Sequence, residues 1–180
     1  QKLFNLCSKV MMQIIVGKKP VIAKVHGSAY AAGCQLVASC DLAYSTSTAT
    51  FATPGVNIGL FCSTPMVAVS RKVNRKKTME MLLTGEPISA KFAKEIGLIN
   101  NYFSRTKLNK EVLKVANKIA SKSNMTVKIG KKAFYKQLEM PISKAYKYTS
   151  KIMTENLSSN DAKEGISAFL QKRKPKWTNS

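Results

Sequence analysis

A short apolar strand that runs into a stretch of small residues is the feature that most constrains the fold. Residues 21–25 (VIAKV) are rich in β-branched side chains and follow Pro20, a pattern typical of a buried strand. The small-residue segment HGSAYAAG comes next, and CQLVAS then predicts a helix that ends near Cys40. Because a strand, a tight junction and a helix make one α/β unit, we expect the chain to begin with such units.

The rest of the chain predicts helices more than strands. Apolar spacing of three and four residues indicates an amphipathic helix over residues 1–16. Further strands are predicted over 42–44, 50–53 and 98–103, and residues 54–65 are expected to be mainly loop. Later helices are predicted over 67–73, 76–83, 89–97, 108–121, 126–138, 143–157 and 161–174. Asp161 and Glu164 resemble a capping box, and Pro175 is expected to end the last helix. We therefore expect an α/β core over residues 1–105 and a C-terminal helical subdomain over residues 106–180.

Composition excludes several classes of protein. The 180 residues suit one ordinary domain, and a hydrophobic content of 44% excludes wholesale disorder. No apolar run approaches the roughly 20 residues that cross a bilayer, so no membrane span is expected. Four cysteines, one histidine and no CxxC pair predict neither a disulfide framework nor a zinc site. The chain begins with Gln1 and not with Met, so we expect a processed or partial product.

Acidic residues are scarce, and this limits the chemistry. Only Asp41 precedes Glu80, so a catalytic pair of carboxylates cannot come from the first 79 residues. The net charge is +21, and most of the excess lies after residue 70. Lysines recur at helical spacing, for which a solvated face is the plain interpretation. The 26 lysines against 4 arginines do not favour sequence-specific nucleic-acid binding, because base readout relies on the arginine fork.

The junction of small residues can bind a partly negative oxygen. Small side chains allow a ligand to approach the backbone, and the first N–H groups of a helix lack intrahelical acceptors. Such groups can form an oxyanion hole from main chain alone. Tight packing between strand and helix is the alternative explanation of the same pattern.

Four blocks of sequence resemble one enzyme family. KPVIAKVHGSAYAAGCQLVASCDLAYS, ATFATPGVNIGL, LLTGEPISAKFAKEIGLIN and the tail EGISAFLQKRKPKW are similar, in order, to blocks of the enoyl-CoA hydratase/isomerase (crotonase) family. The resemblance implies a ββα spiral core, here without its N-terminal part, and C-terminal helices that assemble trimers or hexamers. It also implies an acyl-CoA thioester as ligand, with coenzyme A as part of the substrate and no separate cofactor, and a mitochondrial role in fatty-acid metabolism.

The resemblance assigns roles to particular residues. It implies that two backbone N–H groups hold the thioester carbonyl, the second on Ala32 between Ala31 and Gly33 and the first in a block upstream of Gln1. In the closing helix, it places Phe169 beside the acyl chain and Lys172 near a phosphate or the adenine.

The family's two acid–base glutamates fall on residues that cannot replace them. The first falls on Gln35, and the second falls on Gly55, directly after Pro54. An amide does not titrate near neutral pH, and glycine has no side chain. Because each general acid or base contributes on the order of 10²–10⁴-fold, hydration is predicted to be weak or absent.

The other chemically active side chains receive structural roles. We expect Asp41 to make a structural hydrogen bond, and His26 to be packed or to cap. Cys34 and Cys62 are expected to be buried and inert.

Three functions remain open at this stage. The first is acyl-CoA binding with little or no turnover. The second is an active decarboxylase or isomerase on the same fold, because decarboxylation of a malonyl-type thioester needs mainly enolate stabilisation. The third is a non-enzymatic basic module for RNA or a protein partner, in which the lysines contact phosphates.

Overall fold

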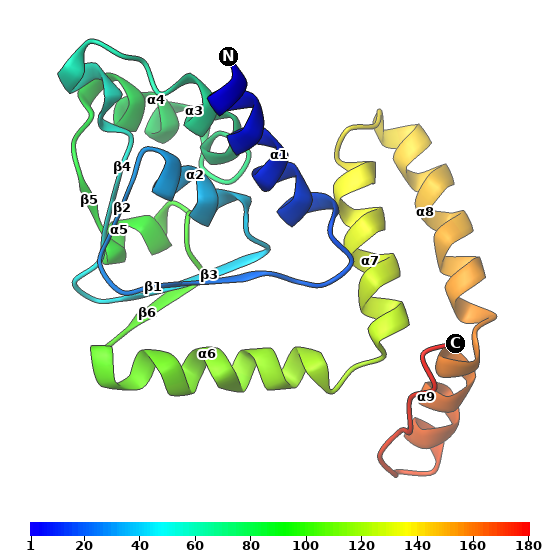
Figure 1. Cartoon of the computed structure of the whole chain (residues 1–180). Helices are drawn as coiled ribbons and strands as arrows, with labels where there is room; N and C mark the ends of the chain where they lie inside the picture. The colour runs from blue at the N-terminus through cyan, green and yellow to red at the C-terminus, as the bar shows by residue number, and fades with distance from the viewer. The chain divides into compact units, whose positions relative to one another are not determined.

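The computed structural model describes residues 1–180, which form two compact units (Figure 1). The first unit comprises residues 1–15 and 21–115, and the second comprises residues 16–20 and 116–180. The domain boundary expected after residue 105 stays a prediction, because packing alone does not show which part folds independently.

The first unit holds all the strands and most of the short helices. Its elements, in chain order, are α1 (Lys2–Val16), β1 (Ile22–Val25), β2 (Ser28–Tyr30), α2 (Ala32–Ser39), β3 (Leu42–Thr46), β4 (Thr50–Ala52), the 3₁₀ helix η1 (Pro54–Ile58), α3 (Ser63–Val69), α4 (Arg75–Thr84), β5 (Ile88–Ser89), α5 (Ala90–Glu95), β6 (Asn101–Phe103) and the start of α6 (Arg105–Ala120). The predicted first helix, strand and second helix are confirmed at α1, β1 and α2.

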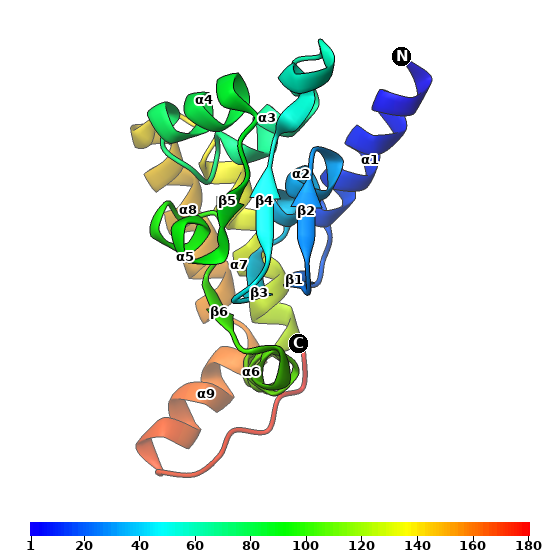
Figure 2. The same cartoon turned by 90° about the vertical axis from the view of Figure 1, so that its left-hand side faces the viewer.

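The strands form two small sheets, and the first four strands, β1 to β4, alternate between them. The order β1-β3-β6 makes one sheet, which is parallel throughout. The order β2-β4-β5 makes the other, in which β2 and β4 are parallel and β5 is antiparallel (Figure 2). Twice the chain adds one strand to each sheet before a helix, first as β1-β2-α2 and then as β3-β4 before η1 and α3, which is the ββα arrangement expected. The last two strands, β5 and β6, are separated by α5.

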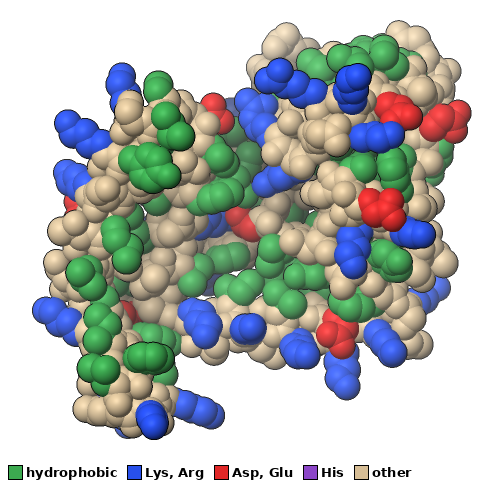
Figure 3. All heavy atoms as spheres, turned by 180° about the vertical axis from the view of Figure 1, so that it is seen from behind, with side chains coloured by type: hydrophobic (Ala, Val, Ile, Leu, Met, Phe, Trp, Pro, Cys, Tyr) green, Lys and Arg blue, Asp and Glu red, His purple; other side chains and the backbone are tan.

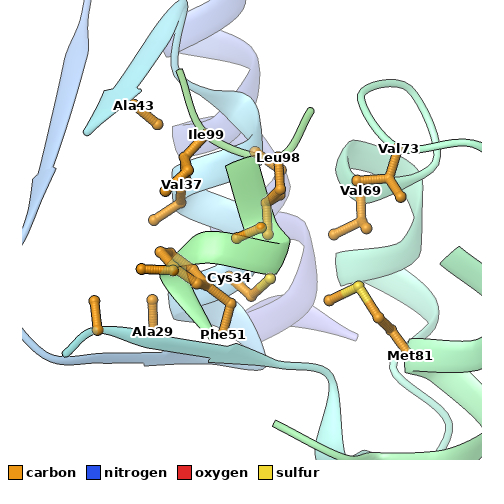
Figure 4. Close-up of a cluster of buried hydrophobic side chains, with 14 residues drawn as sticks. Ala29, Cys34, Val37, Ala43, Phe51, Val69, Val73, Met81, Leu98 and Ile99 are labelled. Atoms are coloured by element: carbon orange, nitrogen blue, oxygen red, sulfur yellow. The ribbon is translucent and has the colours of Figure 1, made fainter. Parts of the chain in front are cut away.

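A hydrophobic cluster fixes the helices of the first unit against the second sheet. Its most buried members include Cys34 of α2, Phe51 of β4 and Val69 of α3, each 0% exposed (Figure 4). Met81 of α4 joins them, and Thr53 donates a hydrogen bond of 2.9 Å to the Met81 carbonyl. Since a buried side chain of this size contributes about 1.5–3 kcal/mol, this cluster sets the positions of the helix ends described below.

The second unit is helical. It contains the end of α6 and then α7 (Asn124–Gln137), α8 (Ile142–Leu157) and α9 (Asn160–Leu170). The predicted capping box is wrong: Ser159 caps α9 by accepting the Ala162 N–H. Asp161 instead accepts hydrogen bonds from the backbone of Thr178 and Asn179, which anchors the C-terminal tail to α9.

Two further expectations differ from the structure. Residues 54–65 are not mainly loop, because η1 occupies most of the first half and α3 begins at Ser63. Helix α9 ends at Leu170 and not at Pro175. Lys172 has a φ of 52°, a left-handed conformation that turns the chain away from the helix before the proline is reached.

Candidate functional site

Parallel pairing of β2 and β4 brings the main candidate residues to one edge of the second sheet. Tyr30 lies opposite Ala52 at the carboxyl ends of the two strands. The next residue, Ala31, donates its N–H to the Ala52 carbonyl at 2.9 Å. Because β2 and β4 are parallel, α2, which starts directly after β2, and η1, which starts just after β4, follow the same edge of this sheet.

The backbone at the start of α2 leaves an N–H group free. The first N–H that donates back within this turn is that of Gln35, to the Ala31 carbonyl at 3.0 Å. The Ala32 N–H therefore has no intrahelical acceptor, and the residue is exposed. Ala31 has φ 48° and ψ −113°, a conformation unfavourable for a residue with a Cβ. Gly33 leaves room, since a Cβ there would lie 3.9 Å from the Ala29 methyl group.

Gln35 is buried, and its side-chain amide has no partner in the chain. The residue is 5% exposed, and hydrogen bonds are found only at its backbone N–H and carbonyl. Because side chains of an α-helix lean toward its N-terminus, we expect the Gln35 amide to extend toward the turn that begins at Ala32. A nearly buried amide without a protein partner is available to hydrogen-bond a ligand or water.

Gly55 is also buried, but the space around it is filled. A Cβ at this position would lie 2.7 Å from the Leu60 carbonyl oxygen and 2.9 Å from Cys62 Sγ. The Gly55 N–H donates to the same sulfur at 3.3 Å. The backbone from Gly59 to Cys62 therefore covers position 55, and no side chain fits there without displacing it. Nothing in the sequence indicated that Cys62, seven residues away, would contact Gly55.

The two cysteines of this region are buried, as expected. Cys34 is 0% exposed and Cys62 is 8% exposed. Burial, together with the nearby Cys62 thiol, raises the pKa of Cys34 to about 12. A thiol with this pKa is not ionised at neutral pH, so Cys34 is a poor nucleophile.

The predictions for Asp41 and His26 have different outcomes. Asp41 Oδ2 accepts the Val21 N–H at 2.7 Å, which confirms the expected structural hydrogen bond at the start of β3. His26 is exposed, so the expectation of a packed side chain is wrong. Its contribution is a backbone carbonyl that accepts the Thr46 hydroxyl at 3.1 Å. His26, Gly27 and Ser28 are all exposed between β1 and the buried Ala29, so the ring stays in solvent.

Phe169 and Lys172 lie in the second unit. Phe169 is 82% exposed at the end of α9, and it lines an apolar pocket of about 620 Å³. Helices α7, α8 and α9 and the tail residue Trp177 form the rest of the pocket wall. Lys172 is exposed and its N–H donates to the Phe169 carbonyl. The roles expected for these two residues stay predictions.

No group of three or more His, Cys, Asp or Glu side chains is placed to hold a metal ion. None of the helices combines the length and the apolar character that a membrane span requires.

Comparison with known proteins relates this geometry to solved structures. The chain is 55% identical to the crystal structure of human enoyl-CoA hydratase domain-containing protein 3, with a TM-score of 0.95, covering 97% of this chain and 69% of that one. It is 50% identical to the enoyl-CoA hydratase of Mycobacterium smegmatis, with a TM-score of 0.96, covering 98% of this chain and 68% of that one. The fold is therefore the crotonase fold, and this chain carries part of it.

Sequence comparison agrees and extends over almost the whole chain. The chain is 54% identical over 178 residues to the Homo sapiens protein named "Enoyl-CoA hydratase domain-containing protein 3, mitochondrial", which covers 99% of this chain and 59% of that protein. It thus spans about three-fifths of that relative's length. The family model for enoyl-CoA hydratase/isomerase matches residues 4–180. The chain belongs to the enoyl-CoA hydratase/isomerase family.

Proposed function

We propose that this chain binds acyl-CoA thioesters at the N-terminus of α2 and hydrates enoyl-CoA weakly or not at all. The Ala32 N–H donates to the thioester carbonyl, and coenzyme A enters as part of the ligand. Relatives at about 50% identity are named as mitochondrial, so we place this activity in mitochondrial fatty-acid metabolism.

The free main-chain donor supports the binding half of this proposal. A helix N-terminus carries a partial positive charge, and an exposed N–H such as that of Ala32 can donate to a polarised carbonyl without a side chain. The family and the solved relatives add the expectation that the ligand is an acyl-CoA thioester.

The packing around Gly55 carries the other half. Family resemblance places one acid–base glutamate at this position, and the Leu60 carbonyl and Cys62 sulfur leave no room for any side chain there. The other position holds the Gln35 amide, which does not exchange protons near neutral pH. With both groups absent, we expect hydration to be at least about 10⁴-fold slower than in a family member that has both glutamates.

Binding and turnover of crotonyl-CoA test the two halves separately. Calorimetric titration should show crotonyl-CoA binding, and a carbonyl-¹³C label should show a red-shifted infrared stretch, because the Ala32 N–H polarises the bond. The ultraviolet absorbance of the enoyl thioester should persist over hours. Hydration at an ordinary enzyme rate would contradict the proposal, as would failure of the thioester to bind.

An active enzyme of the same fold is the second candidate, and the unpartnered Gln35 amide favours it. This amide can orient a carboxylate above a main-chain oxyanion hole, as decarboxylation needs. Product analysis across malonyl- and 3-enoyl-CoA thioesters separates this candidate from simple binding. A new thioester product that depends on the protein would establish catalysis.

A homo-oligomer, expected as a trimer or hexamer, is proposed from the helices of the second unit. These helices expose large apolar side chains, among them Ile142 at 76%, Tyr146 at 71% and Leu170 at 74%. A surface of this kind is typical of a protein interface. Sedimentation equilibrium should give three or six copies, and a monomer at all concentrations would contradict the proposal.

The positive charge does not by itself favour a nucleic-acid module. On the face shown in Figure 3, several lysine and arginine side chains follow one another along the lower edge, interrupted by acidic and hydrophobic ones, and the others are scattered. If RNA bound tightly at physiological salt and coenzyme A failed to compete, the basic-module alternative would replace acyl-CoA binding.

A further inference from the structure

The Gln35 amide sets a requirement on whatever fills the candidate site. It offers two N–H donors and one carbonyl acceptor, and the protein supplies no partner for any of them. The residue is 5% exposed, and no fully buried side-chain nitrogen or oxygen lacks a partner, so the amide meets solvent until a ligand covers it. A purely aliphatic acyl group would cover this amide and leave it unsatisfied, which is unfavourable. The site therefore favours an acyl group with a polar substituent.

The charges nearby decide which polar substituent fits. The amide extends toward the N-terminus of α2, where the helix dipole favours negative charge. Asp41 is the only acidic residue before Glu80, and its carboxylate is engaged by the Val21 N–H. Both positions where the family resemblance expects a glutamate, Gln35 and Gly55, are neutral. A carboxylate on the ligand would therefore meet no negative charge at these two positions that could repel it.

We infer that the ligand is an acyl-CoA whose acyl group bears a carboxylate close to the thioester, as in a malonyl-type monothioester. Ala32 and Gln35 stand three residues apart on one face of α2, so one small dicarboxylic acyl group can span them. The Ala32 N–H donates to the thioester oxygen, and Gln35 Nε2 donates to the carboxylate. This inference rests on the proposed thioester binding and specifies its substrate class.

Malonyl-CoA and isovaleryl-CoA are the matched probes, because their acyl groups have the same number of heavy atoms and differ in charge. Calorimetric titration of the 180-residue chain should show malonyl-CoA binding at least about tenfold more tightly, as expected for a hydrogen bond to a charged group. Equal affinities, or a preference for isovaleryl-CoA, would overturn the inference and leave the proposed thioester binding intact. Failure of both thioesters to bind would overturn the proposed function itself.

Substitutions at Gln35 test whether this residue causes the preference for malonyl-CoA over isovaleryl-CoA. Gln35→Met removes the amide, and the preference should fall to about onefold. Gln35→Glu adds a like charge, and the preference should reverse in favour of isovaleryl-CoA. Gln13→Glu makes the same change on the exposed face of α1 and should leave the ratio unchanged. A ratio that persists in both Gln35 variants, with melting curves showing that they fold, would overturn the assignment.

Discussion

Positions 35 and 55 are alike in the family resemblance and opposite in their packing. Each is expected to hold a glutamate in a hydratase, and each holds an uncharged residue here. At position 35 a side chain of nearly the same size remains, buried and without a partner. At position 55 the side chain is gone, and the Leu60 carbonyl and the Cys62 sulfur occupy its place. Compared with the glutamates that the resemblance expects, position 35 has room for a side chain but no charge, whereas position 55 has neither.

This difference in packing shows which of the two positions could accept a glutamate. A carboxylate at position 35 is almost isosteric with the amide already present, so the backbone needs no adjustment. A carboxylate at position 55 requires the segment from Gly59 to Cys62 to move away. We therefore expect that placing glutamates at both positions would require a rearranged loop as well as two point substitutions. Stability measurements can separate the two positions.

The largest effect is expected at Gly55. Gly55→Ala places a Cβ 2.7 Å from a backbone oxygen, so unfolding free energy should fall by about 1–3 kcal/mol. Urea denaturation followed by circular dichroism measures the change. Gly27→Ala is the control, since a Cβ there meets nothing within 4 Å. Equal stability of the two variants would show that position 55 is open.

Cys62→Ala tests whether the Cys62 sulfur or the Leu60 carbonyl causes the loss of stability in Gly55→Ala. It removes the sulfur contact and leaves the Leu60 carbonyl in place, so it should recover part of the cost, about 1 kcal/mol, in the double variant. Strict additivity of Gly55→Ala and Cys62→Ala would mean that the sulfur does not limit the space.

The opposite sign is expected at Gln35. Replacing a buried, unpartnered amide by the apolar Gln35→Met side chain should raise unfolding free energy of the ligand-free chain by about 1 kcal/mol. Thermal melting without ligand measures this change. A loss of stability similar to that of Gly55→Ala would end the contrast between the two positions and point to a structural role for the amide.

The smallest effect is expected at Ala31, which joins the two regions through its bond to Ala52. Ala31→Gly relieves the unfavourable φ of 48° and should add about 0.5–1 kcal/mol after the backbone entropy of glycine is counted. Ala32→Gly, one residue later in regular helix, should instead lose up to about 1 kcal/mol. Urea denaturation of the two variants checks this, and Ala31→Gly should have the higher unfolding free energy.

Local sequence patterns predicted most of the helices and strands. The features that these patterns did not predict depend on contacts between residues far apart in the sequence. The strand at residues 22–25 and the helix from Ala32 follow from apolar spacing and small residues. Strand β2 was missed because Ser28–Tyr30 is extended by its pairing with β4, not by its own composition. The capping box was predicted wrongly because Asp161 accepts hydrogen bonds from the backbone of the C-terminal tail and does not cap the helix.

The same division applies to the candidate site. The resemblance placed Ala32, Gln35 and Gly55 in one region, and the pairing of β2 with β4 places the segments that carry them side by side. The closed space at Gly55 depends on a loop that returns from seven residues away, which no spacing rule describes.

The donor at the start of α2 belongs to the peptide bond and not to a side chain. Nineteen of the twenty standard amino acids carry that hydrogen, and proline alone lacks it. A larger side chain at position 32 can crowd the ligand, but only a substitution by proline removes the N–H donor. The side chains at positions 35 and 55, in contrast, change with every amino-acid substitution there. Under the proposed function, the chemistry at positions 35 and 55 can therefore change while the same main-chain donor remains available to a carbonyl.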